Sequence, residues 1–592
     1  MLVGTPPPVI LSVFVALGPR SAVVLDEAGQ RSHVCRSELT VRRLIAIALS
    51  ALGVPLCVAA AQSDQPLWKM KLDHYIIFQR LTPAGVLIVS TENALLGVDT
   101  ATGQVAWTRA DIPNLLPQLA QPAPTTSFGT AAEPPATPRV SLTSLWGTPY
   151  VIVARDSANA RTWIELIDAH TGERRWSSDS LPIADVHGYY QLPDSGLLLY
   201  GRTGSGASAK MVFIAADVAT GNVRWRSDTW FSEPPVEYDA DGLEAGRGAL
   251  DGSQWPLFDS DTTAILVWSP QGPIKVNLRS GERLWTTSRR LGTPPALSHG
   301  YPAPLLSDGV VYVSFERRLD AFSVTDGRSR FKEPAKLGGR IVQMEMTPRG
   351  LLVRGGPDWD SRQSQRGFTV RGPEPGGKRF LDLLDPATAQ SRWPKRDKPI
   401  EVTSPFVRQG DAVYAATREK LYRVTLENGD AHELATFKFE AGERAEGLEL
   451  RGGVLVLLSA HTLMGFDTTG QLRFSAFFPP PGPSALARLG VLAANLTSVA
   501  GLAMHQPGYY RFYSLARRDP LRPSAEDYAY VVAAHADSAG LGPPGLLKVR
   551  KDTGKVERRL ALGTKWPEYE TTETGTLLFF QADEHEIDCY RF

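Results

Sequence analysis

Short apolar runs alternate with polar turns along most of the chain, and the runs come in pairs. Clear pairs occupy residues 85–99, 309–324, 411–425 and 453–467, reading GVLIVSTENALLGVD, GVVYVSFERRLDAFSV, DAVYAATREKLYRVT and GVLVLLSAHTLMGFD. Each has a β-rich run, a polar turn and a second run with partial alternation, which is the pattern of two adjacent strands. Ten pairs can be counted, the last of them at residues 575–592. The pattern predicts an all-β protein.

Almost every pair ends in the same ten-residue phrase, first seen as VDTATGQVAW at residues 98–107. Eight further copies follow, at 167–176, 216–225, 276–285, 322–331, 384–393, 424–433, 466–474 and 549–558. Asp or Asn accepts backbone N–H groups in a turn, and Gly supplies a positive φ. The Trp four residues after Gly begins the next strand. The residues expected to form this structural repeat are Asp99, Gly103, Trp107, Asp168, Gly172, Trp176, Asp217, Gly221, Trp225, Gly281, Trp285 and Trp393.

A strand pair cannot bury both of its faces alone, so the repeats must pack on one another. Four-stranded units of about 40 residues, arranged radially, form a β-propeller. The C-terminal pair lacks the phrase, and PLWKMKL at residues 66–72 resembles the missing Trp-bearing strand. We therefore predict a single ring closed by pairing of the N-terminal and C-terminal strands, which leaves no open blade.

The repeated Asp-x-x-Thr-Gly-x-x-x-Trp resembles the tryptophan-docking repeat of pyrroloquinoline-quinone-type (PQQ-like) propellers. Asp99, Thr102, Gly103 and Trp107 carry it in the first copy. The resemblance covers nearly all of the chain after its N-terminal segment. Propellers of this family commonly have eight blades, whereas ten strand pairs are counted here. The expected architecture is therefore a propeller of eight to ten four-stranded blades.

The resemblance also implies a comparison with quinone-dependent dehydrogenases, in which the quinone lies at the centre of the ring beside calcium. Many of these enzymes carry a vicinal disulfide, and some a CxxCH haem domain. The chain has three cysteines, Cys35, Cys57 and Cys589, and the first two lie in a segment expected to be removed. Neither feature is then possible. We expect no catalytic residue, no cofactor-binding residue and no cofactor, with the quinone and calcium as the alternative.

One acidic loop has part of a calcium-binding pattern. In EYDADGLEAGRG, Asp239 and Asp241 follow the spacing of an EF-hand, but Gly248 occupies the twelfth position, where that loop needs a bidentate Glu. Asp239 and Asp241 are therefore only weak metal candidates, and a solvated loop is the preferred interpretation.

The N-terminal region indicates export. Residues 41–61 have two arginines, an apolar run and a small-residue end, the pattern of a signal peptide cleaved after Ala61. Residues 1–40 are interpreted as an extension from a start codon chosen too far upstream, and residues 62–592 as the propeller. The expected location is periplasmic or secreted.

Two stretches interrupt the repeat. Residues 112–139 are rich in Pro, Ala and Thr and are expected to form a loop. Residues 479–519 contain an Ala- and Leu-rich run that could be helical, followed by the candidate interaction residues Tyr509, Tyr510, Arg511, Phe512 and Tyr513. An apolar face packed on the ring is the plainer interpretation of that run.

Composition narrows the functional classes. Lys plus Arg and Asp plus Glu are both 63, so the chain has no net charge and no basic footprint for nucleic acid. The leading hypothesis is a non-catalytic extracytoplasmic scaffold, a monomeric ring that binds a protein partner of the cell envelope, with no transmembrane segment in the mature chain. The alternatives are a quinone- and calcium-dependent dehydrogenase, or a polysaccharide-binding propeller that uses aromatic loops near Trp230 and Trp359.

Overall fold

A computed structural model divides the chain into two units, residues 1–63 and 64–592. It describes residues 65–114, 140–230, 257–289, 304–356, 361–370, 378–394, 400–479 and 527–592, apart from short interruptions within these ranges. The expected signal peptide, Asp239, Asp241, Trp359 and Tyr509–Tyr513 lie outside the described residues, as do all of 115–139 and 480–519. All statements below concern the described part of the second unit.

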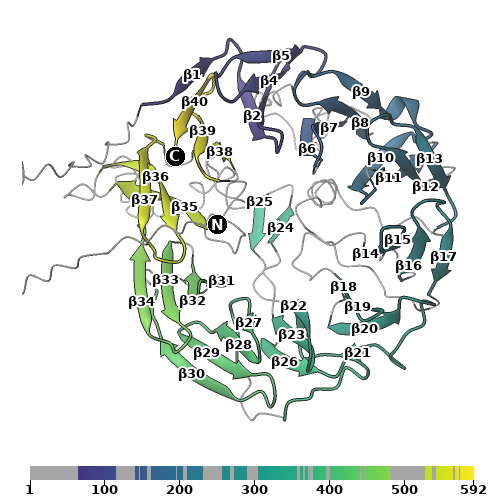
Figure 1. The fold of residues 1–592 in the computed structure, drawn as a ribbon, viewed down its shortest axis with the longest axis vertical. Coiled ribbons are helices and arrows are strands. Elements are labelled where there is room, and N and C mark those ends of the chain that lie inside the picture. Colours follow the sequence, from purple (N-terminus) through teal and green to yellow (C-terminus); the bar gives the residue numbers. More distant parts are fainter. Residues whose placement is uncertain are drawn as a thin grey trace, which may run out of the picture. The chain divides into compact units, whose positions relative to one another are not determined.

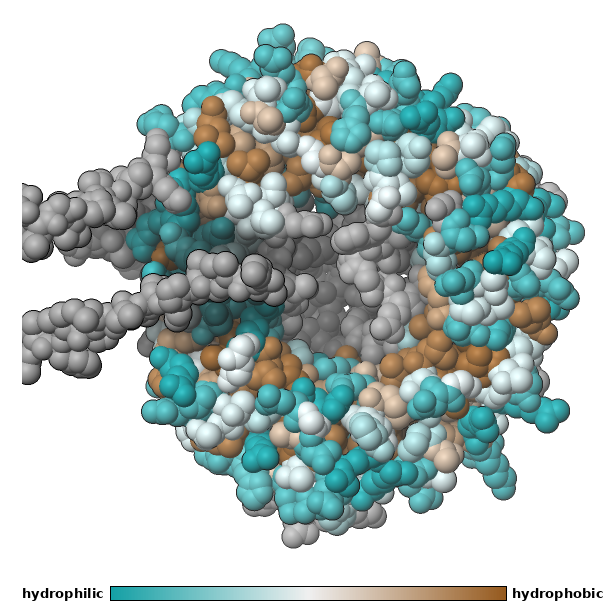
Figure 2. All heavy atoms as spheres, in the orientation of Figure 1, coloured by the Kyte–Doolittle hydropathy of each residue, from teal (hydrophilic) through white to brown (hydrophobic). Residues whose placement is uncertain are grey.

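Ten of the eleven antiparallel sheets in the described residues follow one another along the chain as the blades of a β-propeller (Figure 1). The prediction of an all-β propeller is confirmed, at the upper end of the expected blade number. Eight blades have four strands, and blades 6 and 9 have three. The first strand of each blade lies innermost in Figure 1, and Figure 2 shows hydrophilic residues over most of the outer rim.

Blades 1 to 3 comprise β2 (Ile76–Leu81), β3 (Val86–Thr91), β4 (Leu95–Asp99) and β5 (Val105–Arg109); β6 (Val140–Ser144), β7 (Tyr150–Asp156), β8 (Thr162–Asp168) and β9 (Arg174–Ser177); and β10 (Asp185–Gln191), β11 (Gly196–Thr203), β12 (Lys210–Asp217) and β13 (Val223–Ser227). A 3₁₀ turn, η1 (Ser178–Ser180), follows β9. Blades 4 and 5 comprise β14 (Leu257–Ser260), β15 (Thr263–Leu266), β16 (Ile274–Asn277) and β17 (Arg283–Thr286); and β18 (Leu305–Ser307), β19 (Val310–Phe315), β20 (Arg318–Ser323) and β21 (Ala335–Lys336).

Blades 6 and 7 comprise β22 (Arg340–Thr347), β23 (Gly350–Gly356) and β26 (Phe380–Leu384); and β27 (Val407–Gln409), β28 (Ala412–Ala416), β29 (Lys420–Thr425) and β30 (Ala431–Thr436). Blades 8 and 9 comprise β31 (Gly447–Arg451), β32 (Val454–Leu458), β33 (Thr462–Asp467) and β34 (Leu472–Phe477); and β35 (Tyr528–His535), β36 (Gly542–Arg550) and β37 (Val556–Ala561). A separate hairpin, β24 (Ser361–Ser364) with β25 (Gly367–Val370), is inserted between β23 and β26.

Blade 10 is built from both ends of the second unit. β38 (Tyr569–Thr571), β39 (Leu577–Gln581) and β40 (Glu586–Arg591) come from the C-terminus, and β1 (Trp68–Lys71) comes from the other end. β1 pairs antiparallel with β40, with Trp68 opposite Cys589 and Lys71 opposite Glu586. The predicted closure of the ring by these two strands is thereby confirmed. Closure gives β40 a neighbour on both edges and so removes an open sheet edge within the blade.

Where a repeat phrase ends in Trp, that Trp joins one blade to the next. The Trp107 indole donates to Ala169 O at 2.9 Å, and a Cβ on Gly172 would lie 2.5 Å from Trp107 Cδ2. Gly172 has a φ of 70°, so glycine is required both by the backbone and by the close approach of the ring. The same contacts join Trp68 to the Gly103 turn, Trp176 to Gly221, Trp225 to Gly281, Trp285 to Gly327 and Trp393 to Gly429.

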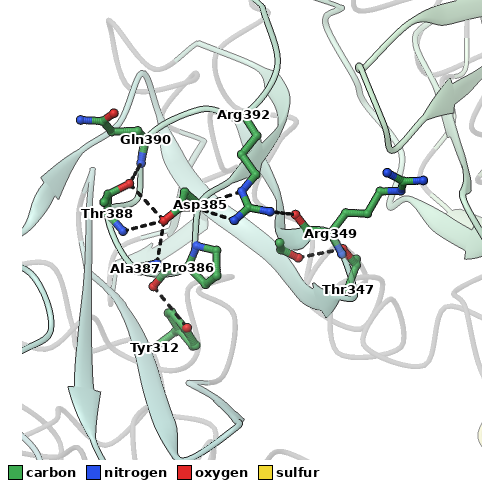
Figure 3. Close-up of polar contacts among 10 residues, drawn as sticks. Tyr312, Thr347, Arg349, Asp385, Pro386, Ala387, Thr388, Gln390 and Arg392 are labelled. Atoms are coloured by element: carbon green, nitrogen blue, oxygen red, sulfur yellow. Dashed lines mark hydrogen bonds and ion pairs between the residues drawn. The ribbon is translucent and has the colours of Figure 1, made fainter.

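Blade 5 joins blade 6 by a substitute for this contact. Its phrase ends in Phe331, which has no N–H to donate, and the receiving turn has Ala389 at the glycine position with a φ of 55°. Tyr312 of β19 supplies the missing donor, because its hydroxyl bonds Pro386 O at 3.3 Å, the carbonyl that receives an indole in other blades (Figure 3). Phe331, Tyr312 and Ala389 share one buried apolar cluster.

Blade 6 has only three strands within the described residues, and the reason is local. Pro394 follows Trp393 directly, and a proline has no N–H for the ladder to β26. Only an isolated bridge, Leu384 with Ser391, remains. The side chain of Asp382 accepts the N–H of Leu383 at 2.8 Å, and Asp320 does the same for Ala321 at 2.9 Å in blade 5. An acidic side chain therefore satisfies an edge N–H where the fourth strand is shortened.

Candidate interaction surface on the turn face

Connections between strands alternate between two faces of the ring. The turns from first to second strand and from third to fourth strand are short and lie on one face, which we call the turn face. Within the propeller, the strand ends that border the long undescribed segments lie at the opposite face, after a second or a fourth strand. The turn face is therefore the part of the surface whose side chains the structure describes most completely.

The acidic residue of the phrase caps its own turn. Asp168 Oδ1 accepts the N–H groups of His170 and Thr171 at 3.0 and 3.3 Å. The other oxygen, Oδ2, pairs with Arg175 at 2.8 Å. Asp217 with Arg224, Asp385 with Arg392 and Asp467 with Arg473 repeat this pair. In blade 4, Asn277 replaces the acid and Leu284 replaces the arginine, so both members of the pair change together.

Blades 6 and 7 extend this pair into a network of exposed charges, and Figure 3 shows its members Arg349, Asp385 and Arg392. The Arg392 guanidinium bonds Asp385 Oδ2 at 2.6 Å and also donates to the backbone carbonyl of Arg349. Arg349 itself reaches across to blade 7, where it pairs with Asp411 at 3.2 Å and with Glu427 at 4.0 Å. These five residues all lie in turns of the same face, and four of them have side chains at least 40% exposed. They form the candidate interaction surface.

The ion pairs of this surface lower the pKa values of two carboxylates, those of Asp385 and Asp411. The Arg392 guanidinium, assisted by the backbone N–H groups of the turn, lowers the pKa of Asp385. Arg349 lowers the pKa of Asp411. Both carboxylates are therefore ionised at neutral pH.

We expect the Asp385–Arg392 pair to lose its contribution to stability in acid. A carboxylate with a lowered folded-state pKa stabilises the fold above its unfolded pKa, near 4, and this contribution disappears as the pH falls through the folded value. Asp385→Asn should therefore cost up to about 1 kcal/mol at pH 7 and less at pH 3. Urea unfolding at both pH values measures this. Asp99→Asn is the control, because Ala106 occupies the matching arginine position and the substitution therefore tests the turn cap without the ion pair.

Two buried ion pairs lie at the contacts between blades rather than on the turn face. Arg109 Nη2 is 3.3 Å from the fully buried Glu165, and Arg289 Nη1 is 3.2 Å from the fully buried Asp320. Burial raises the pKa of both acids, against the opposing effect of the arginines. In the contact between blades 3 and 4, Trp230 donates to Gly281 O at 2.9 Å, as Arg109 does to Gly172 O. These side chains fasten neighbouring blades together.

The burial of Trp230 bears on the polysaccharide-binding alternative, which uses aromatic loops near this residue. The Trp230 side chain itself is only 1% exposed and packs on Phe213 and Trp225. An indole held between two blades has no face free for a sugar ring. The sequence could not distinguish the two roles, because Trp230 lies just beyond the repeat phrase.

Four acidic side chains of the described inner strands have basic partners: Glu345 with Arg408 at 2.6 Å, Glu570 with Arg80 at 3.8 Å, Asp259 with Lys275 at 2.6 Å and Glu449 with Lys551 at 3.1 Å. A carboxylate engaged with a cation is poorly placed to ligate another. Within the described ranges, no three His, Cys, Asp or Glu side chains gather as metal ligands.

No helix within the described residues is long and apolar enough to cross a membrane.

The fold and its repeated Trp–Gly contacts define a β-propeller built from tryptophan-docking repeats. The family model described as outer membrane protein assembly factor BamB, of PQQ-like repeats, matches residues 160–432. The resemblance to PQQ-like propellers that the repeat phrase predicted is thereby supported over residues 160–432.

Solved structures give distant likenesses. The crystal structure of BamB from Moraxella catarrhalis has 13% identity and a TM-score of 0.31, over 69% of this chain and 97% of that one. The computationally designed protein Ika8 has 8% identity and a TM-score of 0.29, over 70% of this chain and 99% of that one. A comparison with curated sequences finds no match.

Sequence reasoning missed most of the turn-face network. The signal was present within the phrase, because Arg stands directly before the Trp in three copies, as Arg175, Arg224 and Arg392. Arg349, Asp411 and Glu427 lie in other turns, and no local pattern connects them. Only the alignment of neighbouring blades brings them together.

Proposed function

We propose that this protein is a non-catalytic scaffold of the cell envelope, which binds a protein partner through the candidate interaction surface and needs no cofactor. One observation carries the proposal. The charges of Arg349, Asp411 and Glu427 are exposed, yet they are held on turns between two closely packed blades. Exposed charges on a rigid support favour recognition of a complementary partner over catalysis, which requires a sheltered site.

The family match supports the same class of function. Its description names an outer membrane assembly factor, which is consistent with a role in the envelope and with the signal peptide expected at residues 41–61. A propeller binds its partners through surface residues, and the fold alone does not say which ones. Here we assign partner binding to the charged turns of blades 6 and 7.

Site-specific cross-linking tests the proposal. A photo-reactive residue in place of Glu427 should give one major adduct in intact cells, identified by mass spectrometry. Arg349→Glu in the same chain should reduce the adduct at least about tenfold, because it places like charges beside Asp411. Arg473→Glu, which alters a matching pair on blade 8, should leave the adduct unchanged. A yield insensitive to Arg349→Glu would reject this surface.

A second assay tests the absence of catalysis. The mature protein is mixed with pyrroloquinoline quinone and calcium and offered alcohols and aldoses with a dye acceptor. The expected rate of dye reduction equals that of quinone and calcium without protein. A rate that rises in proportion to protein concentration would contradict the non-catalytic proposal.

A further inference from the structure

The outer edge of blade 5 carries a line of cations. After the turn at Gly327, the chain runs along β20, where Arg330 N donates to Ala321 O at 2.7 Å and Ser329 bridges Phe322. Ser329 and Phe331 face inward, since the Ser329 hydroxyl bonds Asp320 and Phe331 is buried. Arg328 and Arg330 flank the bridged Ser329 and so face the other way. Lys332 follows in a bend, and all three side chains are exposed.

More cations continue this edge at the other end of the blade. Arg317, Arg318 and Lys336 are exposed, and Arg318 lies opposite Lys336 in the pairing of β20 with β21. Like charges at directly opposed positions disfavour strand pairing. We call Arg317, Arg318, Arg328, Arg330, Lys332 and Lys336 the basic edge.

The basic edge has few acidic partners within the described residues. Arg328 pairs with Asp326 at 3.4 Å, and none of the other five has an ion pair there. Glu333 is exposed beside Lys332, whereas Asp320 is buried and bound to Arg289. The edge therefore has an excess of positive charge, although the whole chain is neutral.

A comparison with the other blades shows how this excess arises. Arg330 occupies the position of Arg175, Arg224 and Arg392, each of which pairs with the Asp of its own turn. In blade 5 that Asp is replaced by Ser323. Blade 4 also lacks the acid, but there the arginine is replaced as well, by Leu284. Blade 5 has thus kept the cation and lost its internal partner.

We propose that the basic edge binds an extended acidic peptide of a partner protein. Arg328 and Arg330 flank the bridged Ser329, so along an extended chain their positions lie about 6.4–6.8 Å apart, and Lys332 adds a third cation beyond the bend. A peptide with Asp or Glu at alternate positions repeats at the same distance and places carboxylates beside Arg328 and Arg330. The proposal rests on the proposed scaffold function, and it concerns a second surface with different residues.

Fluorescence anisotropy of labelled peptides with the mature protein tests the match. One peptide alternates Glu and Ser over eight residues, and the other contains the same residues as Glu-Glu-Ser-Ser blocks. The alternating peptide should bind at least about fivefold more tightly at low ionic strength and weaken as salt is raised. Equal affinity of the two peptides would overturn the alternation argument.

Charge-reversal variants locate the site. Arg328→Glu, Arg330→Glu and Lys332→Glu together should reduce affinity for the alternating peptide at least tenfold. The control reverses Arg174, Arg226 and Arg559, exposed cations of β9, β13 and β37, and should change affinity less than twofold. Circular dichroism of both variants checks that the fold is retained. An equal loss in both variants would show a general charge effect and reject the site.

Ser323→Asp provides a test that removes no cation. It restores the acid found in blades 2 and 3, so Arg330 should pair internally and affinity should fall about threefold or more. Unchanged affinity would reject a role for Arg330. Polyphosphate and anionic phosphatidylglycerol vesicles are tested in the same way. If either binds more tightly than the alternating peptide and loses affinity in the triple variant, the basic edge binds that polyanion and the peptide proposal is wrong.

The two proposals can fail separately. The triple reversal at the basic edge should leave the cross-link at residue 427 unchanged. If the triple reversal removes peptide binding and leaves the cross-link intact, the result supports a peptide site at the basic edge and says nothing about the candidate interaction surface. If Arg349→Glu removes the cross-link, the result supports the candidate interaction surface and says nothing about the basic edge.

Discussion

Trp225→Ala is expected to lower the free energy of unfolding by about 3–5 kcal/mol, the usual cost of removing a large aromatic side chain from a core. Trp225 is 8% exposed and its ring lies against Gly281, where no larger residue would fit. Its indole also donates to Leu278 O at 2.6 Å and contacts Trp230. Truncation therefore removes packing and a hydrogen bond that joins blades 3 and 4. Urea unfolding followed by circular dichroism measures the loss.

Two further variants separate the contributions. Trp225→Phe keeps an aromatic ring but leaves Leu278 O without its donor, so we expect a loss of about 1–3 kcal/mol. Trp163→Ala removes another tryptophan, one that lies half-buried on β8 and bonds Asp179, and should cost less than Trp225→Ala. Equal losses at Trp163 and Trp225 would contradict a special role for the docked position.

The sequence predicted the fold well because the same physical requirement recurs in it. Positive φ, close approach of an indole and a capping acid each restrict the residue type, so Gly, Trp and Asp recur visibly. The terminal strand was predictable for the same reason, because Trp68 stands in a strand that lacks its own phrase. The number of blades could be only bracketed, since the phrase degenerates in blades 5 to 9.

The degenerate copies show why contacts between blades were not predictable. Tyr312 lies 74 residues from Pro386, to which its hydroxyl donates, and nothing in either local sequence marks the pair. Lys551 is a similar case, since it is fully buried in a turn and reaches Glu449 of the preceding blade. Such replacements are specified by geometry between blades, whereas a linear pattern records only requirements within one blade.

In the candidate interaction surface too, contacts within one blade can be read from the sequence and contacts between blades cannot. The pairs Asp385–Arg392 and Asp168–Arg175 lie seven residues apart within the phrase and could have been found by aligning its copies. The extension through Arg349 to Asp411 depends on adjacent turns of blades 6 and 7. Recognition residues of a repeat protein are therefore hard to locate from one sequence, because neighbouring units place them together.

Ring closure gives the second large effect, and Cys589 reports it directly. Its thiol is buried in β40, and burial raises its pKa to about 12, so it should react very slowly with a maleimide at pH 7. β1 covers this site, with Trp68 opposite Cys589 and Leu67 N donating to Cys589 O at 2.6 Å. Labelling must therefore await release of β1 or wider unfolding.

We expect Trp68→Ala to increase the rate of Cys589 labelling by about 10- to 100-fold, measured by mass spectrometry in a chain whose Cys35 and Cys57 are replaced by serine. The substitution removes the ring that lies on the Gly103 turn and the hydrogen bond from its indole to Thr100 O at 3.0 Å. Each 1.4 kcal/mol by which release of β1 becomes easier increases the open population about tenfold. β1 has only four residues, so its docked Trp carries much of its attachment.

Trp393→Ala is the matched control, because it breaks the same kind of contact between blades 6 and 7 and leaves β1 and β40 intact. Labelling of Cys589 should increase much less in this variant. A similar increase in both variants would mean that the thiol becomes accessible only by unfolding of the whole ring. β1 would then be an integral part of the cooperative core, and release of the closing strand would not be a separate, lower-energy event.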